Sequence, residues 1–355
     1  MITTPRGCAC DRVPEDGTMT ALGRFLDDRL GDHQTVTVEP MAGGGSCEVF
    51  AVTRGPARWV LRRAPRHASS SSAHDVLREF RILDAIKDEP VPVARPVLAC
   101  EDPDVFGSPF YVMERIDGAP VRTRIPAAWA HSPATQGTAL EQLVDALVAI
   151  HTVDWRACGL GDLARSGARQ DRKTARWLSQ LESYGGRELP AAHVVGDWLD
   201  VNQPAEQPAA LCHGDYKLDN VLFAPDPPPR LLAVVDWEMA SIGDPLVDLA
   251  WALVFHPGPE GTLRLGVANE PAFDAERLPS RAALIARYAD ASGRDTSALG
   301  WYDIFARWKL AIILEGSYAK FRRGQSDKPV HEHFGRQVDL LLHSATTLIE
   351  RGSRP

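Results

Sequence analysis

The sequence predicts an α+β protein of two lobes, a small β-rich first lobe and a larger, mainly helical second lobe. Its 355 residues exceed the usual size of one compact unit, and two lobes that share a cleft suit a chain of this length. Short alternating segments and one helix occupy the chain up to residue 116, and helical periodicity dominates afterwards. We expect an extension with a first helix over 1–30, a first lobe over 31–116 and a second lobe over 117–355.

The first lobe is predicted to run strand, strand, strand, helix, strand, strand. The strands alternate in hydropathy, and the first two flank a glycine-rich turn. The helix shows apolar residues at helical spacing, follows a serine run that offers an N-cap, and ends before Pro90. In chain order, these segments cover residues 35–40, 47–54, 57–65, 76–87 (the helix), 96–102 and 110–116.

The second lobe is predicted to contain helices around 140–151, 176–181 and 305–321. Between them, residues 209–223 and 230–237 are expected to form a strand, loop, strand pair, because the prolines of the intervening turn prevent continued pairing. Asp244 before Pro245 is an N-cap with proline at the first helical position, so a further helix should begin there.

Composition limits the class of protein. With 44% hydrophobic and 24% charged residues the chain should form a sizeable core. A net charge of −8 without a basic patch disfavours nucleic acid and anionic membranes as partners, and no stretch is apolar enough to span a membrane. The six scattered cysteines indicate reduced thiols, and Cys8 with Cys10 lacks partners at metal-ligand spacing. We expect a cytoplasmic protein.

The strongest chemical signal is the run 213–220, followed by Asp236 at the end of the apolar segment 231–235. Phosphoryl transfer needs a carboxylate that orients the acceptor hydroxyl and oxygen ligands that hold Mg²⁺ on the phosphates. Asp215, Asn220 and Asp236 supply that set. A capped turn and a strand end would explain each part alone, but a carboxylate next to a buried strand needs a partner or a metal. The combination therefore predicts a kinase active site.

Several motifs of the sequence resemble those of a known family. HGDYKLDN, VVDWE and GDPLVDLAW resemble the aminoglycoside phosphotransferase family, which has the protein kinase fold. LRRAPRH, LREFRIL and EDPDVFGSPFYVMERIDG resemble its acyl-CoA dehydrogenase-associated branch. The resemblance implies ATP or GTP and magnesium as cofactors and a small-molecule hydroxyl as acceptor.

The same resemblance implies roles for single residues. Asp215 would be the catalytic base, and Asn220 and Asp236 the magnesium ligands. His213 would brace the catalytic loop, and Asp248 would anchor it from the following helix. A satisfied core histidine and a first-turn helix carboxylate would explain His213 and Asp248 equally well.

A glycine run in the first lobe is a candidate phosphate loop, because its backbone amides could approach a triphosphate. A flexible hairpin turn explains the same run. The run consists of Gly43, Gly44, Gly45 and Ser46. The backbone from Glu114 to Ile116 resembles the family's inter-lobe hinge, which would bind adenine.

Kinase-like folds place a lysine on the third strand, paired with a helix glutamate. This chain has Arg62 and Arg63 there, and Glu79 is the natural helix partner. Alternation places Val60 and Arg62 on one face, which favours Arg62 over Arg63, and arginine can hold a phosphate with two nitrogens. A solvated arginine pair remains an alternative.

Residues 257–355 carry 14 basic and 12 acidic residues, which favours a neutral or anionic acceptor over a polycation. A hydroxyacyl-CoA-like molecule is one hypothesis, with Lys320, Arg322 or Arg323 near its acidic group; a solvated helix end explains these three as well. An antibiotic kinase and a nucleotide-binding pseudokinase are the alternatives. A dinucleotide-binding oxidoreductase is rejected, because the glycine run lacks the G-x-G-x-x-G spacing.

Overall fold

The fold is taken from a computed structural model, which describes residues 16–41, 47–65, 76–121, 125–129, 132–164, 174–256 and 278–352. The chain forms two compact units. Unit 1 comprises residues 1–117 together with 235–239, and unit 2 comprises 118–234 and 240–355. A short segment of the later chain therefore belongs to unit 1, and this segment contains Asp236.

Unit 1 is built on a five-stranded antiparallel sheet with the strand order β1-β2-β3-β5-β4. The three first strands are hairpin neighbours, and β5 lies between β3 and β4. This agrees with the predicted order of elements. The strands are β1 Val36–Pro40, β2 Glu48–Arg54, β3 Ala57–Arg63, β4 Pro96–Cys100 and β5 Phe110–Glu114.

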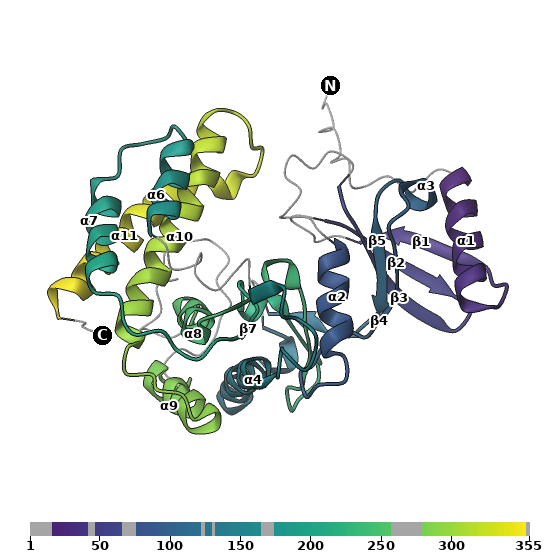
Figure 1. Ribbon diagram of the computed structural model, residues 1–355, viewed down its shortest axis with the longest axis horizontal. Helices are drawn as coiled ribbons and strands as arrows, with labels where there is room; N and C mark the ends of the chain where they lie inside the picture. Colours follow the sequence, from purple (N-terminus) through teal and green to yellow (C-terminus); the bar gives the residue numbers. More distant parts are fainter. Residues whose placement is uncertain are drawn as a thin grey trace. The chain divides into compact units, whose positions relative to one another are not determined.

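Helices cover both faces of this sheet, as Figure 1 shows. On one face lie α1 (Asp16–Leu30) and the short α3 (Pro103–Phe106), packed on alternate strand residues such as Phe50 and Val112. On the other face lies α2 (Val76–Ile86), the helix expected from the apolar spacing. The alternation of strand side chains thus separates an apolar face under α1 from a partly polar face under α2.

Unit 2 is mainly helical (Figure 1). Each predicted helix exists, and α10 is the long one expected around 305–321. Asp244 caps α8 by accepting a hydrogen bond from the Leu246 amide, with Pro245 at the first position as predicted. The helices are α4 Pro133–Thr152, α6 Thr174–Ser183, α7 Pro190–Val201, α8 Pro245–Val254, α9 Arg281–Ser292, α10 Leu299–Arg322 and α11 Phe334–Glu350.

The strands of unit 2 form two small sheets. In one, β8 (Val221–Phe223) pairs with β9 (Leu231–Val234) across the proline turn, as expected, and with β6 (Ala119–Pro120). In the other, β7 (Ala210–Cys212) pairs with β10 (Ser241–Gly243). The predicted hairpin is thus divided, because the loop after β7 redirects the chain and β7 takes a partner from beyond residue 240.

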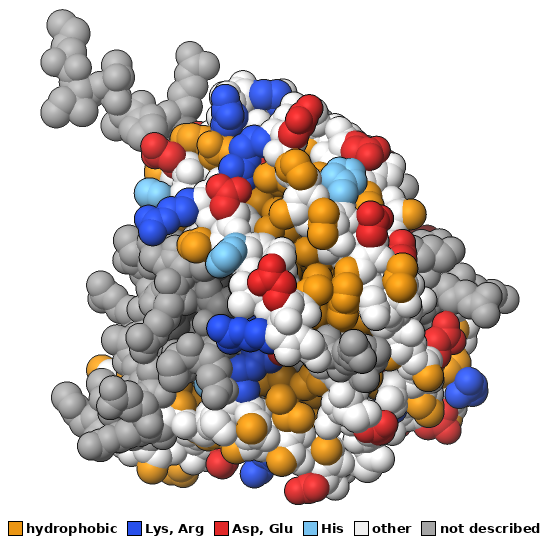
Figure 2. Space-filling view, turned by 90° about the vertical axis from the view of Figure 1, so that its left-hand side faces the viewer, with side chains coloured by type: hydrophobic (Ala, Val, Ile, Leu, Met, Phe, Trp, Pro, Cys, Tyr) orange, Lys and Arg blue, Asp and Glu red, His pale blue; other side chains and the backbone are white. Residues whose placement is uncertain are grey.

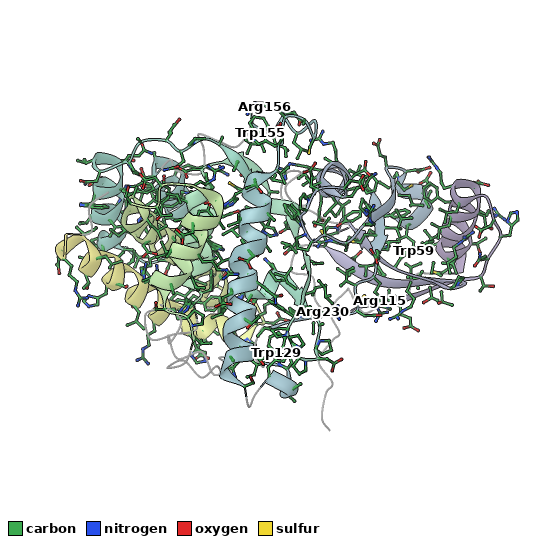
Figure 3. The ribbon with its side chains drawn as sticks, turned by 90° about the horizontal axis from the view of Figure 1, so that it is seen from below. Trp59, Arg115, Trp129, Trp155, Arg156 and Arg230 are labelled. Atoms are coloured by element: carbon green, nitrogen blue, oxygen red, sulfur yellow. The ribbon has the colours of Figure 1, made fainter. Side chains whose placement is uncertain are left out.

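Helix α4 runs between two aromatic anchors (Figure 3). Trp129, in the 3₁₀ turn Ala127–Trp129 before the helix, is fully buried with its ring edge-on to Phe223 at 5.4 Å. Beyond the other end, Trp155 carries the Arg156 guanidinium over its ring at 3.9 Å. Trp155 Nε1 also donates to the Ala209 carbonyl at 3.3 Å, directly before β7, and Tyr216 of the loop after β7 donates to the Leu143 carbonyl of α4 at 2.7 Å.

The surface of unit 2 mixes apolar and charged side chains. Figure 2 views the side that carries α7, where apolar groups lie among acidic, basic and histidine side chains. Val194 and Val201 of α7 are among the exposed apolar residues. Within the described ranges, no helix combines the length and the apolar character that crossing a bilayer requires.

Candidate active site

The loop between β7 and β8 carries the polar run 213–220. It leaves the buried strand β7 through Gly214, whose φ of 86° lies in the left-handed region that favours glycine. A 3₁₀ turn over Leu218–Asn220 then leads into β8. The chain reverses within this loop, and the reversal brings Asn220 back to Asp215.

Three side chains donate hydrogen bonds to the Asp215 carboxylate. Lys217 Nζ lies 2.8 Å from Oδ2 and 3.0 Å from Oδ1, and Asn220 Nδ2 donates to Oδ2 at 2.9 Å. Trp251 Nε1 on α8 donates to Oδ1 at 2.8 Å. The Asp215 side chain remains 27% exposed. The carboxylate is therefore held in one orientation and is still accessible to a small molecule.

Asp248, on the first turn of α8, holds the backbone of the same loop. Its Oδ2 accepts from the His213 amide at 2.5 Å and its Oδ1 from the Gly214 amide at 2.9 Å. Burial alone would raise the pKa of Asp248, but the neighbouring His151 side chain and the hydrogen bond from the His213 amide keep it below its usual value. Asp248 is therefore ionised, and its carboxylate holds the loop backbone at two consecutive amides.

His213, the first residue of the loop, is fully buried. Its Nδ1 accepts a 3.3 Å hydrogen bond from the Asp215 amide, and its ring meets Tyr216 edge-on at 5.9 Å. These contacts connect the residue to the backbone of Asp215. Its position fits a brace of the loop.

Unit 1 contains a second polar cluster around Arg62 on β3. Arg62 Nε lies 3.2 Å from Glu79 Oε2 on α2, and an Arg62 terminal nitrogen donates to Asp236 Oδ1 at 2.9 Å. Burial would lower the pKa of Arg62, but the neighbouring acidic groups Glu79, Tyr111 and Asp236 raise it well above its usual value. The guanidinium thus stays charged between two carboxylates.

Arg63 points to the opposite face of the sheet. It donates to Glu48 Oε2 at 2.7 Å and to the Phe106 carbonyl at 2.7 Å, with its guanidinium over the Phe50 and Phe106 rings. The pairing of Glu79 with Arg62 rather than Arg63 follows the alternation seen in the sequence.

The backbone around Asp236 is held by α2. Glu79 Oε1 accepts from the Trp237 amide at 3.0 Å, and Arg78 donates to the Glu238 carbonyl at 3.0 Å. Asp236 has a φ of 71°, a left-handed conformation that is uncommon for a residue with a side chain. The Asp236 side chain is 35% exposed, so one face of this carboxylate remains available. Strain held by specific bonds is typical of functional positions.

Other predicted nucleotide-binding positions lie in unit 1. Val60 is half-buried on the face of Arg62. Glu114 ends β5 with an exposed side chain and Ile116 follows it, while the amides of Glu114 and Arg115 donate to the carbonyls of Arg95 and Arg58. The candidate phosphate loop lies outside the described residues; it comprises Gly43, Gly44, Gly45 and Ser46. Asn220 belongs to unit 2 and Asp236 to unit 1, so their common metal site stays a prediction.

Sequence reasoning missed two residues that contact Asp215. Lys217 lies inside the quoted motif, two positions after Asp215, which was the available signal. Trp251 follows Asp248 by three positions, so the two share a helix face, and this spacing was the signal there. Lys309 of α10 lies over the Trp251 ring, with 4.8 Å between Nζ and the ring centroid.

Three basic residues considered for the acceptor are exposed at the end of α10: Lys320, Arg322 and Arg323.

Some proteins with a similar sequence are much longer than this chain. Acyl-CoA dehydrogenase family member 11 of Gallus gallus is 30% identical over 320 residues, which cover 89% of this chain and 41% of that protein. The chain therefore spans about two fifths of the length of such relatives. Viomycin phosphotransferase of Streptomyces vinaceus is 29% identical over 266 residues, which cover 70% of this chain and 78% of that protein.

Solved structures share the fold. An inferred aminoglycoside phosphotransferase from Ralstonia eutropha superposes with a TM-score of 0.78 at 28% identity, covering 92% of this chain and 98% of that one. Choline kinase of Cryptosporidium parvum superposes with a TM-score of 0.60 at 13% identity, covering 90% and 91%. The architecture is thus kinase-like, with an antiparallel sheet in one lobe and helices in the other.

The family model named phosphotransferase enzyme family matches residues 37–302, which include both polar clusters. This match covers most of the chain and agrees with the resemblance seen in the sequence. The chain therefore belongs to the phosphotransferase enzyme family and has a kinase-like fold.

Proposed function

We propose that this protein transfers the γ-phosphoryl group of a nucleoside triphosphate to a hydroxyl group of a small molecule, with Asp215 as the base. The observation that carries the proposal is the Asp215 carboxylate, which Lys217, Asn220 and Trp251 hold while it remains accessible. Phosphoryl transfer relies on positioning and charge stabilisation, and a fixed carboxylate in a kinase-like fold suits the orientation of an acceptor hydroxyl.

In the proposed step the acceptor oxygen forms a bond to the γ-phosphorus, and the bond from that phosphorus to the β,γ-bridging oxygen breaks. The nucleoside diphosphate leaves, and the hydroxyl proton passes to Asp215. Lys217 supplies positive charge next to the base, where negative charge of the transferring group gathers.

We propose Asn220 and Asp236 as magnesium ligands. The Asn220 amide nitrogen is committed to Asp215, both to its carboxylate and to its backbone carbonyl at 2.8 Å, so the amide oxygen is the atom left for a cation. Asp236 offers a partly exposed carboxylate, and both donors are the hard oxygens that magnesium prefers. When bound, magnesium would neutralise charge on the phosphates.

Nucleotide binding is proposed for unit 1. Arg62, paired with Glu79, stands at the third-strand position where kinases carry a lysine, and its planar group can hold phosphate oxygens with two nitrogens. Further candidates are the backbone of Glu114 and Ile116, the side chain of Val60 and the glycine run 43–46. Either ATP or GTP fits this proposal.

The proposed acceptor is a hydroxyacyl-CoA-like molecule. The support is that the longer relatives bear the name of acyl-CoA dehydrogenases, and that residues 257–355 have a slightly basic balance. An antibiotic is the second candidate, favoured by the likeness to viomycin phosphotransferase. A nucleotide-binding module without transfer activity is the third, favoured by the arginine at position 62. A cytoplasmic location stays a prediction.

The test is transfer from Mg·ATP and Mg·GTP to a panel of hydroxyacyl-CoAs, aminoglycosides, macrolides and sugars, detected by mass spectrometry as a gained phosphoryl group. Phosphorylated hydroxyacyl-CoA that is absent with Asp215→Ala supports the proposed acceptor. Product confined to an antibiotic would replace that acceptor class. Tight nucleotide binding without product from any acceptor would favour the binding module.

A further inference from the structure

A buried chain of polar groups lies behind the loop after β7, entirely within unit 2. Tyr288 of α9 contacts His151 of α4, with 2.7 Å between the phenol oxygen and Nδ1. His151 Nε2 in turn lies 3.5 Å from Asp248 Oδ2, and Asp248 accepts the amides of His213 and Gly214. Tyr288, His151 and Asp248 are each at most 2% exposed, so all three lie away from bulk solvent.

The protonation states of Tyr288, His151 and Asp248 follow from their burial. Burial raises the pKa of the Tyr288 phenol, which therefore stays a donor, and burial lowers the pKa of His151, which stays neutral. A neutral imidazole carries one N–H. If Nδ1 accepts from Tyr288, the proton lies on Nε2, the ring nitrogen that faces the Asp248 carboxylate.

The groups around His151 agree with this tautomer. Arg294 donates to the His151 carbonyl at 3.1 Å and opposes a second proton on the ring, whereas Asp248 and Asp244 favour one. Within the described residues, His151 Nε2 is a fully buried atom without a hydrogen bond of ordinary geometry, and Asp248 Oδ2 lies 3.5 Å from it. A buried N–H without an acceptor is costly, so the carboxylate in reach is its natural partner.

We propose that His151 is a positioning residue for phosphoryl transfer, acting through Asp248 on the backbone of the catalytic loop. This inference rests on the proposed role of Asp215 as base. The Asp248 carboxylate holds two consecutive amides directly before Asp215, one of them at Gly214 with its left-handed backbone. A carboxylate free to rotate would hold neither amide well. In this proposal His151 restricts that freedom through its contact with Oδ2, which it makes from a buried position on α4.

A metal site is the rival interpretation of the same residues. Cys212 is buried, and its sulfur lies within 4.8 Å of the ligand atoms of His151 and Asp248. Both Asp248 oxygens already accept loop amides, which a bound ion would have to weaken. Without an ion, Asp248 keeps both loop amides and His151 Nδ1 keeps its contact with Tyr288.

The test compares His151→Leu with His151→Gln. Leucine keeps the bulk without an N–H, and glutamine places an amide N–H near the position of Nε2. Because a hydrogen bond to a charged group is involved, His151→Leu should lower kcat about 10- to 100-fold with the nucleotide KM nearly unchanged, and glutamine should restore kcat to within about threefold. Amide hydrogen exchange at 212–216 should accelerate in the leucine variant but not in the glutamine variant, with α11 as the internal reference.

Tyr288→Phe provides a variant that keeps the fold if His151→Leu does not. It removes the phenol donor that fixes the tautomer, so both kcat and the protection of the loop amides should fall. Equal kcat for His151→Leu, His151→Gln and wild type, or unchanged exchange at 212–216 in Tyr288→Phe, would overturn the proposal. A stoichiometric metal in the purified protein that Cys212→Ser removes would also overturn it.

The same experiment separates this inference from the proposed function. An Asp215→Asn variant that is inactive beside a fully active His151→Leu would reject only the role of His151. An Asp215→Asn variant that still transfers phosphate would reject the role of Asp215 as base, while the exchange data would still report on the brace.

Discussion

The indole nitrogen of Trp251 donates a 2.8 Å hydrogen bond to Oδ1 of Asp215, so a residue of α8 fixes the orientation of the carboxylate in the preceding loop. The same helix carries Asp248, which holds the loop backbone. One helix therefore sets both the backbone and the side-chain position of the proposed base.

Trp251→Phe tests this relationship, because it keeps the aromatic ring and removes only the donor. Since a hydrogen bond to a charged group is worth about 1.5–3 kcal/mol, kcat should fall about 10- to 100-fold. The nucleotide KM should stay close to wild type. Trp198→Phe on α7 is the matched control and should leave kcat unchanged. An unaltered kcat in Trp251→Phe would show that the bond does not serve transfer.

Lys217→Met removes the positive charge that lies 2.8 Å from Asp215 Oδ2. We expect kcat to fall at least about tenfold, because the site loses a charge placed where negative charge develops. Lys217→Arg keeps the charge and should retain more activity than Lys217→Met. Steady-state kinetics with the acceptor found in the panel measures both. Equal activities of the two variants would contradict a role for the charge.

Arg62→Ala should destabilise unit 1 strongly. The change leaves Glu79, which is 1% exposed, without its buried cation, and breaking such a pair costs about 3–5 kcal/mol. Arg58→Ala breaks the exposed pair with Asp117 and should cost at most about 1 kcal/mol. Urea unfolding followed by fluorescence measures the free energy of unfolding of both variants. Similar losses would argue against a structural dependence on the Arg62 pair.

The ionised carboxylate of Asp27 in α1 should contribute to the free energy of unfolding, and this contribution should be lost in acid. Hydrogen bonds from His33 and Arg54 lower the pKa of Asp27 from 3.8 to about 2. A carboxyl with a lowered pKa in the folded state stabilises the protein above its unfolded pKa of about 4, and this contribution is lost as the pH falls towards 2.

The urea midpoint of wild type should therefore exceed that of Asp27→Asn at pH 6, and the difference should shrink below about pH 4. Asp28→Asn, on the same helix, is the control and should follow the wild-type pH dependence. A wild-type advantage that grows as the pH falls from about 4 towards 2 would contradict the sign of this prediction.

Much of the fold could be predicted because its elements have local signals. The apolar spacing over 76–86 and the cap at Asp244 with Pro245 identified α2 and α8, since capping and periodicity depend on near neighbours. The partner of β7 could not be predicted in this way. It lies in Ser241–Gly243, and three residues carry too little periodicity to identify a strand.

The residues of the candidate site also differ in whether a local signal in the sequence identifies them. The spacing of Asp215 and Asn220, and the alternation that selects Arg62 over Arg63, are local and were readable. The contact of Trp251 with Asp215 and the chain from Tyr288 to Asp248 join residues far apart in sequence. Only tertiary structure brings such residues together, so a single sequence does not indicate these contacts.

The most direct measurement compares phosphoryl transfer by Asp215→Asn and by wild type, with nucleotide affinity determined on the same preparations. A positioned base contributes about 10²- to 10⁴-fold, so the variant should lose at least about 100-fold in kcat while binding the nucleotide with nearly wild-type Kd. Transfer within about tenfold of wild type would contradict Asp215 as the base and, with it, the proposed mechanism.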